Sequence, residues 1–105
     1  MLTIILLCNL GMSTGILEDK IKEAAEARGL PVKVLAVPYD RADDILNTAD
    51  ILLLGPQVRY HLLRFQKDYA GKIPVIDVMN FSDYGLANGE KILADALVKY
   101  KANKP

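Results

Sequence analysis

The sequence predicts a small α/β domain, an open four-stranded parallel sheet with helices on both faces. Four short apolar runs rich in Val, Ile and Leu recur along the chain, and helix-like stretches separate them. Continuous apolar runs are typical of strands buried on both faces, and strands that alternate with helices fold through right-handed crossovers. The 105 residues, 51% of them hydrophobic, suffice for one core, so we expect a single domain over residues 1–105.

The predicted elements alternate along the chain. The expected strands are Leu2–Leu7, Val32–Val37, Ile51–Leu54 and Ile73–Ile76. The first helix is expected over Ser13–Arg28 and ends at Gly29; its buried stripe should comprise Ile16, Leu17, Ile21, Ala24, Ala25 and Ala27. The other helices are predicted over Asp40–Leu46, Val58–Tyr69 and Ala87–Lys101, followed by a frayed tail, Ala102–Pro105.

Composition excludes several classes of function. The 13 basic and 13 acidic side chains cancel, so no overall positive field favours nucleic acid. One cysteine cannot form an intrachain disulfide, which suits a reducing compartment. The apolar stretch Leu2–Leu7 is too short for a signal peptide or a membrane span. We expect a cytoplasmic protein without a metal or another cofactor.

Ligands of open α/β sheets bind outside the carboxyl ends of the strands. Function is therefore expected in four loops: Cys8–Gly11, Pro38–Asp40, Gly55–Gln57 and Asp77–Gly89.

The first of these loops has the features of an anion site. It joins a buried strand to the start of a helix, where N–H groups and the helix dipole bind phosphate. Gly11 allows the backbone to curl around the anion, and Ser13 and Thr14 supply hydroxyls for phosphate oxygens or for helix capping. The same field favours the thiolate of Cys8, which makes it a candidate nucleophile for a phosphoryl group.

Other interpretations of this loop stay open. Cys8 could be a small hydrophobic residue that ends a core strand. It could be the nucleophile of a phosphatase with Asp83 as general acid, although such enzymes follow the pattern C-x5-R and position 14 is Thr. A flavin mononucleotide carrier could use Ser13 and Thr14 for phosphate and Tyr60 and Tyr84 against the ring. Because Arg is absent at position 14, we favour phosphoryl transfer over hydrolysis.

The chain resembles the IIB family of the lactose/cellobiose phosphotransferase system over nearly its whole length. The similarity is strongest to the cellobiose (diacetylchitobiose) branch. The matching segments are the strand before Cys8, Gly11-Met12-Ser13-Thr14, Leu53-Leu54-Gly55-Pro56-Gln57, Ile76-Asp77 and Tyr84-Gly85. The chain departs from the branch pattern C-S-A-G-M-S-T-S at Asn9, Leu10 and Gly15.

The resemblance implies a fold and a mechanism. The fold would have flavodoxin-like topology, similar to low-molecular-weight tyrosine phosphatases. A IIA phosphohistidine would donate to Cys8, which would pass the phosphoryl group to a cellobiose-, chitobiose- or lactose-type β-glycoside bound by the membrane component IIC. Contact with the membrane would be through IIC only. The implied phosphate-binding residues are Asn9, Leu10, Gly11, Met12, Ser13 and Thr14, with auxiliary or docking roles for Tyr84 and Gln57.

Other polar side chains of the predicted loops and helices have structural interpretations. We expect His61, on an amphipathic helix, to be a solvated histidine rather than a second phosphoryl carrier. Asp83 is expected to be a solvated turn residue. Gly55-Pro56-Gln57 predicts a turn and a helix start, with Arg59 and Tyr60 near a docking rim if the first and third strands are neighbours.

Overall fold

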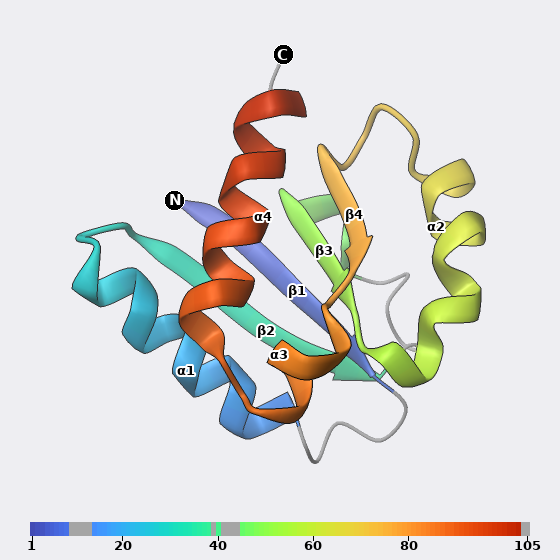
Figure 1. Ribbon diagram of the computed structural model, residues 1–105. Helices are drawn as coiled ribbons and strands as arrows, with labels where there is room; N and C mark the ends of the chain where they lie inside the picture. The colour runs from blue at the N-terminus through green and yellow to red at the C-terminus, as the bar shows by residue number, and fades with distance from the viewer. Residues whose placement is uncertain (9–13, 39, 41–44, 104–105) are drawn as a thin grey trace.

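Four strands form one parallel sheet in the order β2-β1-β3-β4 (Figure 1). The computed structural model describes residues 1–8, 14–38, 40 and 45–103. The strands are β1 (Leu2–Cys8), β2 (Val32–Pro38), β3 (Ile51–Leu54) and β4 (Val75–Val78). The predicted α/β class is confirmed, and the first and third strands are neighbours, the condition on which the expected docking rim depended.

Helices cover both faces of this sheet (Figure 1). One face carries α1 (Thr14–Ala27) and α4 (Gly89–Asn103). The other carries the 3-10 helices η2 (Leu46–Thr48) and η3 (Pro56–His61) and the helix α2 (Leu62–Asp68). A five-residue helix, α3 (Phe81–Gly85), follows β4. No helix among the described residues is both long and apolar enough to cross a bilayer.

Alternation along β1 divides the core into two layers. Ile4 and Leu6 pack with α1 and α4, whereas Ile5 and Leu7 pack towards α2. All four side chains are fully buried, and burial of one such side chain contributes roughly 1.5–3 kcal/mol. The apolar run Ile4–Leu7 of β1 follows from the central place of the strand, because both of its faces are covered.

The first helix agrees with the prediction in extent but not in its whole buried stripe. Leu17, Ile21, Ala24 and Ala25 are buried, and Gly29 follows the helix with φ +65°. Ile16 is 63% exposed and Ala27 is also exposed, so both assignments to the core were wrong. Ile16 lies in the first turn of α1, where its apolar side chain faces solvent.

The last strand starts two residues later than predicted. The Ile73 amide donates to Tyr69 O at 3.2 Å, which ties this residue to the turn after α2. Pro74 has no N–H to donate to a sheet ladder. Pairing with β3 therefore begins at Val75, whose amide donates to Asp50 O, and it continues to Val78.

The remaining helices differ from prediction at their ends. The expected Val58–Tyr69 helix is instead η3, which begins earlier, at Pro56, and is kinked at Val58 (φ −114°, ψ 19°), followed by α2. The last helix extends to Asn103, so the start of the predicted tail is helical, while 104–105 lie outside the described residues. Of the helix predicted over Asp40–Leu46, residues 41–44 are not described, and Leu46 begins η2.

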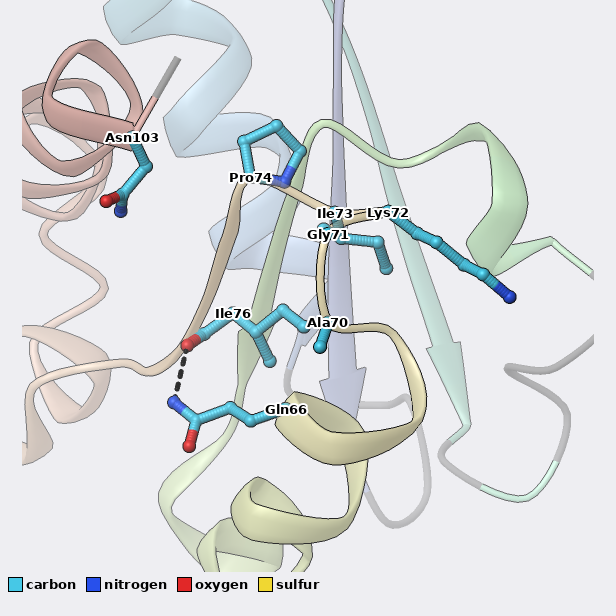
Figure 2. Close-up of a pocket in the computed structure, with 8 residues that line it drawn as sticks. All are labelled: Gln66, Ala70, Gly71, Lys72, Ile73, Pro74, Ile76 and Asn103. Carbon is cyan, nitrogen blue, oxygen red and sulfur yellow. Dashed lines mark hydrogen bonds between the residues drawn. The ribbon is translucent and has the colours of Figure 1, made fainter. Parts of the chain in front are cut away.

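Side chains bind backbone groups of both edge strands. Gln66 of α2 donates through Nε2 to Ile76 O of β4 at 3.1 Å, across an open hollow of about 600 Å³ that Pro74 and Asn103 also line (Figure 2). On the other edge, the Ala36 amide of β2 donates to Glu18 Oε2 at 3.2 Å. The hollow lies beside the start of β4, so it is at the opposite end of the sheet from Cys8.

Candidate functional site

Cys8 is the last residue of the central strand. Its partner on β2 is Pro38, and its side chain is 2% exposed. By the alternation of Ile4 and Leu6, the thiol lies on the face that α1 and α4 cover. The burial is what a core-strand cysteine would show, whereas the position at the carboxyl edge is what a ligand site requires.

The loop after β3 packs directly against the end of β1. The Gly55 amide donates to Leu7 O at 2.7 Å, one residue before Cys8. A Cβ at position 55 would lie 2.7 Å from Gln57 Oε1 and 3.2 Å from Leu7 O. The absence of a side chain on Gly55 therefore lets Gln57 fold back over the carboxyl end of β1.

Gln57 and Tyr84 meet above this point. Gln57 Nε2 donates to the Tyr84 hydroxyl at 3.2 Å, although 27 residues separate them in sequence. The Tyr84 ring is half-buried against the α1/α4 core layer, and its Cε1 would be 3.7 Å from a Cβ on Gly55. The two residues thus connect the loops after β3 and β4 beside the strand that ends at Cys8.

Helix α3 presents Tyr84, and sequence analysis missed this helix. Asn80 caps it: its Oδ1 accepts from the Asp83 amide at 3.0 Å, and its carbonyl accepts from the Tyr84 amide at 2.9 Å. Asn followed three residues later by Asp is a recognisable helix start. That signal could have found α3, although five residues are too few for apolar periodicity.

The expectation that Asp83 is solvated was wrong. Asp83 is 7% exposed, and its buried Oδ2 lies 3.5 Å from Lys91 Nζ of α4. The partner comes from the next helix, where a sequence pattern does not reveal it. The Asp83 side chain is thus engaged with Lys91 of α4, whereas the phosphatase interpretation needs it to donate a proton at the cysteine.

The expectation that His61 is solvated was also wrong. His61 is half-buried and its Nε2 is buried, with the ring centroid 4.3 Å from Tyr60 and 6.4 Å from Phe65. Arg59 donates through Nη1 to Pro56 O at 2.9 Å, which stabilises the start of η3. Pro56 occupies the first turn of that 3-10 helix, as the sequence predicted.

The predicted phosphate-binding loop lies mostly outside the described residues. Asn9, Leu10, Gly11, Met12 and Ser13 belong to the part that the structure does not describe. Thr14 is the first residue of α1. The structure therefore places a strand end on one side of this loop and a 14-residue helix on the other, the order that the sequence predicted.

These features define an α/β protein with a cysteine at the carboxyl end of its first strand. A family model, the lactose/cellobiose-specific IIB subunit of the phosphotransferase system, matches residues 3–95. The chain therefore belongs to this IIB family.

Curated relatives agree with this family. The oligo-beta-mannoside-specific EIIB component of Bacillus subtilis is 38% identical over 97 residues, which cover 90% of this chain and 91% of that protein. The lactose-specific EIICB component of Streptococcus mutans is 33% identical over 70 residues, 65% of this chain and 12% of that longer protein. The chain is a IIB component of the lactose/cellobiose type, acting in sugar phosphotransfer.

Solved structures agree with the fold. The cellobiose-specific IIB component of Borrelia burgdorferi has a TM-score of 0.77 and 31% identity, covering 97% of this chain and 94% of that one. The lactose-specific IIB domain of Streptococcus pneumoniae has a TM-score of 0.83 and 24% identity, and the match covers 94% of this chain and 97% of that one. A low-molecular-weight protein tyrosine phosphatase of Bacillus subtilis has a TM-score of 0.57 and 13% identity, and the match covers 99% of this chain and 100% of that one. The predicted likeness to such phosphatases is confirmed for the fold alone.

Proposed function

We propose that Cys8 carries the phosphoryl group between two partners in the cytoplasm. The donor is the phosphohistidine of a IIA component, and the acceptor is a sugar bound by a membrane IIC component. The fusion of IIC and IIB in the Streptococcus mutans relative supports partnership with IIC. The single observation that carries the proposal is the place of the only cysteine, at the carboxyl end of the central strand.

The proposed chemistry is two successive transfers. The Cys8 thiolate attacks phosphorus, so that an S–P bond forms while the N–P bond of phosphohistidine breaks. A sugar hydroxyl then attacks the same phosphorus, an O–P bond forms, the S–P bond breaks, and the hydroxyl proton passes to solvent or a base. The residues Asn9–Thr14 would supply amide donors to the phosphoryl oxygens, as the start of α1 favours an anion there. The acceptor class is a cellobiose-, chitobiose- or lactose-type β-glycoside.

Intact-protein mass spectrometry tests the carrier residue. The chain is incubated with phosphoenolpyruvate, the general phosphotransferase proteins and a IIA component, alongside Cys8→Ser. Wild type should gain one phosphoryl group, about 80 Da, and Cys8→Ser should gain none, because a serine hydroxyl is not ionised near neutral pH. An equal gain on both proteins would assign the phosphate to another residue and reject Cys8 as carrier.

A second assay separates transfer from hydrolysis. With Thr at position 14 and Asp83 held by Lys91, we expect no catalytic turnover of p-nitrophenyl phosphate. Sustained release of p-nitrophenol by wild type but not by Cys8→Ser would favour the phosphatase interpretation instead.

A further inference from the structure

The exposed face of η3 and α2 has an unusual charge distribution. From Ile51 to Asp68 the side chains charged at neutral pH are three exposed cations, Arg59, Arg64 and Lys67, and one exposed anion, Asp68, the last residue of α2. Because the whole chain has 13 basic and 13 acidic residues, the remainder carries ten basic against twelve acidic residues. The molecule is formally neutral, and this segment has a net positive charge.

Apolar side chains are exposed on the same face. Tyr60 is 70% exposed and Leu63 is 78% exposed, while Val58 and Phe65 of the same segment are fully buried. Tyr60, Leu63 and Lys67 follow one another at intervals of three and four residues, which places them on one side of a helix. Exposed tyrosine and leucine between cations are typical of a protein contact surface rather than of a solvated helix.

The cationic face starts beside the carrier cysteine. η3 follows β3 directly, Gly55 donates to Leu7 O next to Cys8, and Gln57 of η3 binds Tyr84 over the same strand end. From Tyr60 to Lys67 the face extends by roughly 10 Å along the helix. At about 10 mM salt the screening length is about 30 Å, longer than this face, so its charges act on a partner that approaches Cys8 when the salt concentration is low.

We propose that the face formed by Arg59, Tyr60, Leu63, Arg64 and Lys67 docks an acidic surface of the phosphohistidine donor. This inference rests on the proposed function of Cys8. The phosphoryl group itself adds negative charge to the donor, which matches a cationic face. Cytoplasmic loops of membrane proteins carry an excess of Lys and Arg, so the same face is mismatched with loops of the membrane acceptor.

Charge reversal at one exposed lysine tests the electrostatic part. Lys67→Glu is compared with Lys72→Glu, an equal change of charge in the turn after α2. Transfer from the phosphorylated IIA donor is measured by rapid quench and intact mass over a range of donor concentrations. At about 20 mM salt, Lys67→Glu should lower the second-order rate constant roughly five- to tenfold, with the rate at saturating donor unchanged. At about 500 mM salt the difference should fall below about twofold, and Lys72→Glu should match wild type at both.

A second pair of variants tests the apolar part. Leu63→Ser should raise the donor concentration at half-maximal rate at every salt concentration. Val98→Ser, at a 69% exposed position on α4, should not. The same assay with the membrane acceptor should show no effect of Lys67→Glu.

The possible failures are distinguishable. Absence of phosphate on wild-type Cys8 rejects the proposed function and this inference together. Normal phosphorylation of Cys8 with identical rate constants for wild type and Lys67→Glu at low salt rejects the docking face alone. A loss for Lys67→Glu in transfer to the membrane acceptor alone also rejects the docking face. The same holds if wild type, but not Lys67→Glu, binds phosphatidylglycerol vesicles in a salt-sensitive way while the rate of transfer from the donor is the same for both.

Discussion

The side-chain amide of Gln57 donates to the hydroxyl of Tyr84 at 3.2 Å and so joins the loops that follow β3 and β4. The bond lies over Gly55, whose amide binds the carbonyl of Leu7. Both loops thus act on the strand end that presents Cys8, although neither residue belongs to β1. Substitutions at these residues and in the surrounding core test this arrangement and the fold that supports it.

Tyr84→Phe keeps the ring and removes the hydroxyl. The hydrogen bond is exposed, so the free energy of unfolding should fall by less than about 1 kcal/mol. Transfer to Cys8 should slow several-fold if the bond positions the two loops. Gln57→Met should cause the same loss, and the double variant no further loss, because both changes remove one contact. Tyr100→Phe, on α4, is the control, and additive losses in the double variant would contradict the shared role.

Gly55→Ala introduces a Cβ where there is little space. The new atom would be 2.7 Å from Gln57 Oε1 and 3.2 Å from Leu7 O. We expect a loss of about 1–3 kcal/mol in urea unfolding, since Leu7 O is backbone in the central strand and cannot move freely. Gly85→Ala is the matched control because nothing lies within 4 Å of its Cβ position. Equal stability of the two variants would show that Gln57 simply moves aside.

Asp83→Asn and Asp95→Asn remove two carboxylates that lie near the same lysine. Lys91 Nζ is 3.5 Å from Asp83 Oδ2 and 3.8 Å from Asp95 Oδ2, but the Asp83 side chain is 10% exposed and the Asp95 side chain 53%. Asp83→Asn should lower the free energy of unfolding by about 1–2 kcal/mol, because removing one charge from a buried ion pair costs more than removing one from an exposed pair. Asp95→Asn should cost less than about 0.5 kcal/mol. The reverse order would show that burial does not set the strength of these pairs.

The two phenylalanines of the chain form a natural pair for comparison. Phe65 is fully buried in the layer under α2, whereas Phe81, in the first turn of α3, is 79% exposed. Phe65→Ala should lower the unfolding free energy by about 3–5 kcal/mol through the lost contacts and the cavity left behind. Phe81→Ala should change it by less than about 0.5 kcal/mol. Chemical denaturation of both variants gives the comparison directly.

Much of the fold could be predicted from the sequence because parallel strands buried on both faces are continuous apolar runs. β3 was predicted to the residue, and β1 and β2 each extend one residue further, to Cys8 and Pro38. Ile73-Pro74 misled the prediction of β4, since apolar character does not show where backbone hydrogen bonds begin. Ile16 misled the prediction of the buried stripe of α1, because its apolar side chain lies in the first turn of the helix and is exposed.

The candidate site could be predicted in part. The loops at the carboxyl ends of all four strands were identified as the place of the site, and Gln57 and Tyr84 of two of these loops do meet. The burial of Asp83 and His61 could not be predicted, since it depends on Lys91 of another helix and on ring contacts made by Tyr60 and Phe65. The roles of Asn9–Thr14 stay a prediction.

The side chains that bind the outer strands have a consequence for how this molecule meets others. A sheet edge with available amide and carbonyl groups invites another chain to add a strand through backbone hydrogen bonds. Here Gln66 already binds Ile76 O, and Glu18 accepts from the Ala36 amide on the opposite edge. A strand added at either edge would first have to displace the side chain bound to that edge. Brief encounters through side chains at one end of the sheet are then favoured over lasting backbone pairing, and a carrier that must release each partner after every exchange depends on such encounters.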